Sequence, residues 1–197
     1  MKSSTELSDN LLKDFKSSKY QESYLRLAND RNIFLCEDVT KEVAATISAL
    51  LIYYDNIDTT KDINIYINSN GGDADSLINM YDIMQVIKSP IKTICIGKAY
   101  SAGAVLLAAG TKGKRVAFKN SEVMLHQLQC SFPIIGKTEA TSSDIYLKFL
   151  NKYNDKILKI LSKHTGYSLN KIKTDSARDL FFSAEEALNY NLIDEII

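Results

Sequence analysis

The alternation of strand-like and helix-like patterns between Asp62 and Gly110 constrains this chain most. "DINIYIN" (62–68) alternates like a strand, and the glycine-containing turn signal "SNGGDAD" (69–75) follows it. "SLINMYDIMQVIKSP" has the apolar spacing of a helix that ends before a proline, and the β-branched run "IKTICIG" is typical of a buried strand. The apolar stretch "SAGAVLLAAG" then begins another helix. This order predicts an α/β fold with a largely parallel sheet.

The flanking segments extend the same alternation. Residues 32–56 read as a short strand and a helix that Thr40 caps, and residues 142–167 as a long amphipathic helix. Two short strands are expected in "KRVAF" and "EVMLH", and a capped helix with a last strand in "SAEEALNYNLIDEII". We find no internal repeat, and we expect residues 1–20 to form a mobile N-terminal arm and 21–197 a single domain.

Composition excludes several classes of function. The 24 basic and 24 acidic residues balance, so no overall field attracts nucleic acid or an anionic membrane. The first residues lack a secretory signal, and no apolar run is long enough to span a bilayer. Three cysteines at irregular spacing and two histidines give no metal pattern. Reduced thiols of this kind fit a cytoplasmic protein without a metal.

Ser101 stands where the strand "IKTICIG" passes into the apolar helix, with small residues around it. One interpretation is a helix N-cap, the commonest role of a serine at such a place. The other is a nucleophile, because the unpaired N–H groups of a helix start would stabilise an oxyanion beside it. The local pattern differs from the G-x-S-x-G elbow, because Ala99 occupies the first glycine position.

A nucleophilic serine needs a base and an acid that orients it. His126 ends a buried strand and is a candidate base or a core histidine, whereas His164 at a helix end is better explained as a structural residue. Spacing alone does not choose the acid among Asp144, Asp155, Asp175 and Asp179. The paired glycines of "NSNGGDAD" make a turn, and they also allow an extended peptide to approach backbone N–H groups.

Taken together, the residues from "YINSNGG" through "GKAYSAG" and "VMLHQ" to "HTGYSLNKI" and "DSARDLFFSAEEALNYNLID" resemble ClpP, the proteolytic subunit of the ATP-dependent Clp protease. That family lies within the crotonase-like superfamily, and the resemblance runs from about Tyr24 to the C-terminus. It implies repeated β-β-α and βα units with a protruding handle, a strand plus a long helix, at about 127–163.

The resemblance implies a serine endopeptidase in which Ser101 is the nucleophile, His126 the base and Asp179 the acid. It further implies oxyanion donors at the N–H groups of Gly72 and Ala102. The peptide is expected to bind extended, between Gly71–Gly72 and the segment of Gln127 and Leu128 after the histidine.

The family also implies assembly into two stacked heptameric rings, with a AAA+ unfoldase such as ClpX, ClpA or ClpC docked outside. The chain itself would need no cofactor, because only the unfoldase uses ATP. Arg178 is expected to link the site to contacts between rings. The apolar pocket that receives the unfoldase corresponds here to Tyr66, Val86, Ile94, Val116 and Phe118.

Several positions depart from the family pattern. Asn70 replaces a proline in "NSPGG", Leu128 replaces the proline of "HQP", and Asn64 replaces an aromatic residue of the docking pocket. The segment "LQCSFPIIGKTEA" is longer than the glycine-rich handle strand and contains Pro133. We therefore expect a divergent paralogue, and one hypothesis is that it requires a second ClpP. The alternative functions are a largely architectural ring subunit and, from the same superfamily, an acyl-CoA enzyme.

Overall fold

The structure is a computed structural model that describes residues 19–129 and 140–197. It divides into two compact units between Asn32 and Ile33. In the first unit, helix α2 (Lys19–Asn29) is amphipathic and exposes Tyr24 and Leu27. Most of the expected N-terminal arm lies outside the described residues, as does the greater part of the handle segment that precedes the long helix.

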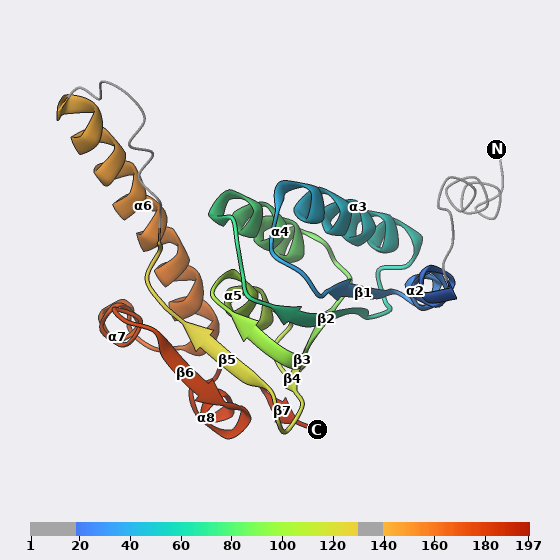
Figure 1. Cartoon of the computed structure of the whole chain (residues 1–197). Coiled ribbons are helices and arrows are strands. Elements are labelled where there is room, and N and C mark those ends of the chain that lie inside the picture. The colour runs from blue at the N-terminus through green and yellow to red at the C-terminus, as the bar shows by residue number, and fades with distance from the viewer. Residues whose placement is uncertain (1–18, 130–139) are drawn as a thin grey trace. The chain divides into compact units, whose positions relative to one another are not determined.

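The strands form one sheet, as the sequence predicts, in the order β1-β2-β3-β4-β7, with β5 paired to β3 and β6 paired to β5 (Figure 1). All the pairings whose register is defined are parallel except that of β5 with β6. The strands are β1 (Asn32–Leu35), β2 (Ile63–Ser69), β3 (Ile91–Tyr100), β4 (Arg115–Ala117), β5 (Glu122–Leu125), β6 (Leu180–Ser183) and β7 (Glu195–Ile196).

Strand β3 is central to the sheet because it pairs with two different strands, β4 and β5, along one edge. Its first half pairs with β4 and its last three residues, Lys98 to Tyr100, pair with β5. The sequence predicts this strand to end at Gly97, whereas it continues to Tyr100. Gly97 lies inside it with φ +145, and Ser121 accepts its N–H at 3.1 Å. The glycine therefore bends the strand from one partner to the next without ending it.

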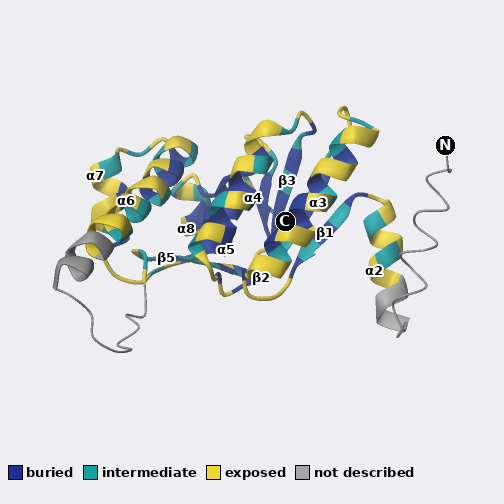
Figure 2. Cartoon of the chain, turned by 90° about the horizontal axis from the view of Figure 1, so that it is seen from above, coloured by how far each residue is buried: buried dark blue, intermediate teal, exposed yellow. Residues whose placement is uncertain are grey.

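Helices α3 (Lys41–Ile57), α4 (Ala74–Val86) and α5 (Ala102–Ala108) lie side by side, with buried faces turned to the sheet (Figures 1 and 2). Thr40 caps α3 as expected, and Asp73 caps α4 by accepting the Ser76 N–H at 2.9 Å. Helix α5 is buried along its whole length, which explains why its sequence is apolar on every side. The cap at Asp73 begins α4 immediately after the Gly71–Gly72 turn.

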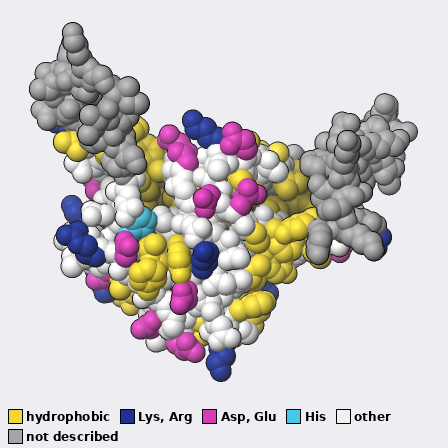
Figure 3. Space-filling view, in the orientation of Figure 1, with side chains coloured by type: hydrophobic (Ala, Val, Ile, Leu, Met, Phe, Trp, Pro, Cys, Tyr) yellow, Lys and Arg dark blue, Asp and Glu magenta, His cyan; other side chains and the backbone are white. Residues whose placement is uncertain are grey.

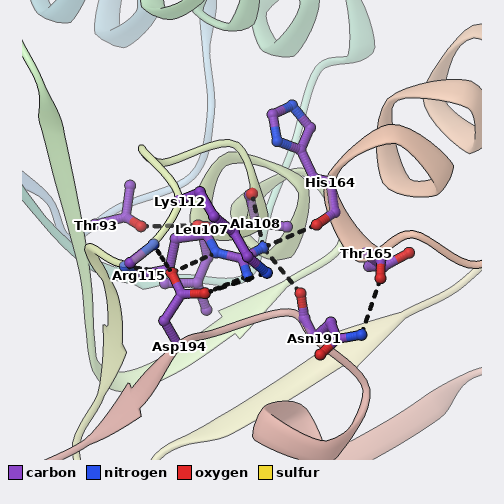
Figure 4. Close-up of polar contacts among 10 residues, drawn as sticks. Thr93, Leu107, Ala108, Lys112, Arg115, His164, Thr165, Asn191 and Asp194 are labelled. Carbon is purple, nitrogen blue, oxygen red and sulfur yellow. Dashed lines mark hydrogen bonds and ion pairs between the residues drawn. The ribbon is translucent and has the colours of Figure 1, made fainter.

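The C-terminal third adds α6 (Ala140–Thr165), α7 (Leu169–Asp175) and α8 (Ala184–Asn189). A buried arginine on β4, Arg115, joins several of these elements (Figure 4). It pairs with Asp194 at 2.6 and 2.8 Å and donates to the carbonyl oxygens of Ala108, His164 and Asn191. One guanidinium group thereby holds together the ends of α5 and α6 and the residues just before β7.

Candidate active site

Ser101 connects β3 to α5 in an unusual backbone conformation, with φ +53 and ψ −117. Such a conformation is rare for a residue with a side chain, and it is held because the Ser101 N–H donates to the Met124 carbonyl at 2.8 Å. The side chain makes no capping hydrogen bond to α5. The N-cap interpretation therefore does not account for this serine, whose hydroxyl has no hydrogen-bond partner within the described chain.

The Gly71–Gly72 turn lies directly against Ser101. A Cβ added to Gly71 would lie 2.7 Å from the Ser101 Cβ and 2.9 Å from the Ala102 nitrogen, so no larger residue fits without movement. Val39 fixes the turn from the other side by donating to the Gly71 carbonyl and accepting the Asp73 N–H, both at 2.8 Å. Glycine is thus required for close approach as well as for its φ of +95.

Two backbone N–H groups beside the serine are available as donors. Within the described ranges, neither the Gly72 N–H nor the Ala102 N–H has a hydrogen-bond acceptor. Ser69, at the end of β2, supports the turn by accepting the Gly71 N–H at 3.1 Å while its hydroxyl donates to Glu37. The turn carries Asn70 in place of proline, and the Asn70 side chain donates to Asp38 at 3.4 Å.

Strand register brings the histidine and the aspartate together. Tyr100 pairs with Met124 in the parallel β3–β5 ladder, and Leu125 pairs with Leu180 in the antiparallel β5–β6 ladder. Ser101 comes directly after Tyr100, His126 directly after Leu125, and Asp179 directly before Leu180. Three strand ends therefore converge at one place, although 78 positions separate Ser101 from Asp179 along the chain (179 − 101).

His126 and Asp179 are close but not hydrogen-bonded. The His126 Nδ1 lies 4.0 Å from the Asp179 Oδ1, beyond the usual range for a hydrogen bond. The histidine side chain is only 12% exposed and its Nδ1 has no partner, whereas the aspartate is 54% exposed. Nor does a hydrogen bond join Ser101 to His126 in the part of the chain that the structure describes. The three groups can form a relay only after they move within hydrogen-bond distance of one another.

A cavity of about 350 Å³ opens at this convergence. Residues of the Gly71–Gly72 turn, α4, α5, β5, the segment after β5 and α6 form its wall, so it is bounded by elements from distant parts of the chain. The lining residues include Asn70, Gly72, Leu77, Ser101, Ala102, Met124, His126, Gln127, Leu128, Gln129, Ile157, Leu161 and Asp179. Every residue expected to act in catalysis or at the oxyanion lies on this wall.

The other candidate acids are placed elsewhere. Hydrogen bonds from Lys171 and Tyr190 lower the pKa of Asp175, which does not line the cavity. Asp155 is exposed on α6 and is also absent from the wall, and the side chain of Asp144 is not among those described. Of the three candidate acids whose side chains the structure describes, Asp179 is the one beside His126.

His164 lies outside the cavity, in accordance with its expected structural role. Its Nε2 is 3.3 Å from the Tyr81 hydroxyl, rather than on a helix carbonyl. Burial, with the charges of Lys163 and Arg115, lowers the pKa of His164 to about 4. The imidazole is therefore neutral near pH 7 and does not complement the dipole of α6.

Among the described residues, no group of three or more His, Cys, Asp or Glu side chains could hold a metal ion. None of the helices in the described ranges is long and apolar enough to cross a lipid bilayer.

The model of the Clp protease family matches residues 15–197. This match covers nearly the whole chain, including both described units and the complete cavity wall. The chain belongs to the Clp protease family. The mixed α/β architecture with its mostly parallel sheet is the fold expected for ClpP, and membership makes the chain a ClpP-type peptidase. Clp proteases in general form rings and work with an unfoldase.

The five residues expected to form an unfoldase-docking pocket divide into two groups. Tyr66, Ile94 and Val116 are aligned in register across β2, β3 and β4, and Phe34 stacks on Tyr66 with ring centroids 5.0 Å apart. Apolar side chains gather over β1 and β2 on the face shown in Figure 3. Ile94 and Val116 are buried within this chain.

The remaining two residues of that set, Val86 and Phe118, are 81% and 44% exposed. Arg178, expected to act in contacts between rings, is also exposed and donates only to the Ala177 carbonyl among the described residues.

The sequence did not identify the contribution of α6 to the site. Ile157 and Leu161 line the cavity, Asn154 accepts the Leu128 N–H, and the Tyr153 hydroxyl donates to Asp75 in the first turn of α4. The amphipathic spacing of α6 predicted a buried face but gave no information on what that face would cover. The only available signal was the apolar pair Ile157 and Leu161, which any core helix would share.

Proposed function

We propose that this chain is a serine endopeptidase subunit that cleaves unfolded polypeptides and short peptides through an acyl-enzyme. The observation that supports this best is the environment of Ser101, whose unbonded hydroxyl shares a cavity with two unpaired backbone N–H groups and His126. A serine held in a rare backbone conformation, with no capping bond, needs a role other than helix capping.

In the proposed reaction, His126 takes the hydroxyl proton as Ser101 attacks the scissile carbonyl carbon. The N–H groups of Gly72 and Ala102 hold the negative charge that develops on the carbonyl oxygen. His126 then gives its proton to the leaving amine, and the acyl-enzyme forms. Water, activated by the same imidazole, attacks the ester and releases the second product.

Asp179 would orient the imidazole through Nδ1, the atom that lacks a partner. The present separation of 4.0 Å must shorten by about 1 Å to give a hydrogen bond. Because Asp179 is more than half exposed and precedes an edge strand, movement of the segment before β6 would supply this approach.

The same separation favours a second candidate function, a largely architectural ring subunit that needs a second ClpP paralogue for activity or for unfoldase docking. In either case we propose assembly into two stacked heptameric rings, with a AAA+ unfoldase of the ClpX, ClpA or ClpC type as partner. The chain would work in the cytoplasm and without a cofactor of its own.

Labelling of the purified full-length chain with a fluorophosphonate probe tests the proposal. We expect a Ser101 adduct by mass spectrometry, no adduct in Ser101→Ala, and peptide cleavage reduced by roughly 10⁴-fold in that variant. His164→Gln should label like the wild type, because His164 lies outside the cavity. Labelling and cleavage that appear only after a second ClpP is added would favour the architectural subunit.

A further inference from the structure

The segment that follows His126, Gln127 to Gln129, lines the cavity without belonging to a strand of the chain. Two side-chain hydrogen bonds hold it. The Gln127 Nε2 donates to the Ala177 carbonyl at 3.1 Å, and the Leu128 N–H donates to the Asn154 Oδ1 at 3.0 Å. The first bond connects the segment to the residues just before Asp179, and the second connects it to α6.

Asn154 is itself held in place by its helix. The neighbouring Tyr153 hydroxyl donates to Asp75 in the first turn of α4, and Ile157 and Leu161, one and two turns further on, line the cavity. Asn154 is half-buried, so water is partly excluded from the bond that it accepts. An acceptor on a fixed helix can therefore set the position of the Leu128 N–H.

We propose that Asn154 is a positioning residue for peptide substrate. In an extended segment, the backbone polar groups of successive residues point to opposite edges. By holding the Leu128 N–H on the α6 edge, Asn154 leaves the backbone groups of Gln127 and Gln129 on the other edge, where a peptide can add as a strand. This inference rests on the proposed function for its choice of ligand, an extended polypeptide.

Loss of this acceptor would weaken peptide binding without disturbing the chemistry at Ser101. The Leu128 N–H would be left unpaired or would turn to another acceptor, so the segment would no longer present one fixed edge. A slip of one residue would also reverse which side chains face the substrate. Ser101, His126 and Asp179 are held by the β3–β5 and β5–β6 ladders, which do not include Asn154.

Three variants separate this role from a general effect on α6. Asn154→Leu removes the acceptor at similar volume, and Asn154→Asp keeps a side-chain oxygen at the same place. Asn151→Leu makes the same replacement at an exposed position three residues earlier on the same helix, where the side chain has no hydrogen bond to the described residues. Sizing and thermal unfolding of each variant would establish that assembly and folding are retained.

Affinity for a fluorescein-labelled unfolded peptide, measured by anisotropy in a Ser101→Ala background, is the readout that does not depend on turnover. We expect Asn154→Leu to weaken binding about fivefold, the typical effect of one hydrogen bond, with Asn154→Asp and Asn151→Leu close to the parent. When Ser101 is intact, the KM of Asn154→Leu should rise by a similar factor. Its kcat and its rate of labelling by the fluorophosphonate should stay unchanged.

Equal affinity in Asn154→Leu and Asn151→Leu would overturn the inference, even if Ser101 proves reactive. A joint fall of labelling rate, kcat and melting temperature in both Asn154 variants would also overturn it, because it would indicate a structural role. Weakened binding in Asn154→Leu together with an unreactive Ser101 would instead refute the proposed peptidase and leave the positioning role of Asn154 standing.

Discussion

Replacement of Gly71 by alanine tests the geometry on which the proposed oxyanion site depends. The added methyl carbon would lie 2.7 Å from the Ser101 Cβ, 2.8 Å from the Tyr100 carbonyl oxygen and 2.9 Å from the Ala102 nitrogen. Ordinary carbon–carbon contacts are about 3.5–4.0 Å, so the turn and the serine must separate by about 1 Å. Two of the three neighbours are backbone atoms, which cannot be relieved by a change of rotamer.

A shift of that size matters because the serine and the two N–H donors act on the same carbonyl group. A misplacement of about 1 Å at reacting groups typically costs about 10²-fold in rate. The φ of +95 at Gly71 adds a backbone cost of about 1–2 kcal/mol in stability when a side chain is present. We therefore expect both a loss of kcat of roughly two orders of magnitude and a modest fall in melting temperature.

Gly113→Ala is the matched control, because Gly113 has a similar φ of +84 but nothing within 4 Å of an added Cβ. It should show the same modest loss of stability and full peptidase activity. Turnover of a fluorogenic peptide and thermal unfolding, measured on both variants, separate steric displacement from backbone strain. If Gly71→Ala cleaves as fast as Gly113→Ala, the turn does not supply the oxyanion site and the reasoning fails.

Three further predictions concern charged groups. Arg115→Met should lower the free energy of unfolding by about 3–5 kcal/mol in denaturant titration, because it removes the guanidinium group that pairs with Asp194 and donates to three carbonyl groups; a loss below 1 kcal/mol would be inconsistent with this network. Asp179→Asn should reduce kcat by about 10³–10⁴-fold, whereas Asp175→Asn should leave it unchanged, and equal effects of the two would contradict the assignment of the acid. The pKa of His164 falls from 6.5 to about 4 on folding, so the unfolded chain binds a proton before the folded chain does as pH falls. The free energy of unfolding should therefore drop by up to about 3 kcal/mol between pH 6.5 and 4. His164→Gln should remove this drop when unfolding is measured as a function of pH.

Local patterns predicted most of the sheet and the helices over it. The segments from Asp62 to Gly110 carry clear strand and helix periods, and the structure confirms each of them, because those periods reflect which face is buried. Strand β6 was not predicted, because "LFFS" is short and has no alternation that distinguishes it from a turn. Its antiparallel pairing with β5 is a contact between distant parts of the chain.

That missing strand explains why sequence spacing left the acid open. The register of Leu125 opposite Leu180 brings Asp179 beside His126, and no local property of Asp179 separates it from Asp175 in the sequence. The serine presented the same difficulty, since a cap and a nucleophile have the same sequence environment. The φ of Ser101 and its lack of a capping bond arise from the pairing of β3 with β5.

Leu128 and Asn154 provide a last test of how the site tolerates its departures from the family pattern. A proline at 128 would have no N–H, so leucine introduces a donor that must find a partner. Asn154 accepts that N–H at 3.0 Å, and the two positions should therefore be coupled. Once Leu128→Pro has removed the donor, Asn154→Leu should weaken peptide binding no further, giving a coupling free energy of about 1 kcal/mol in a double-mutant cycle. Strictly additive effects would mean that Asn154 acts on the cavity by some route other than this hydrogen bond.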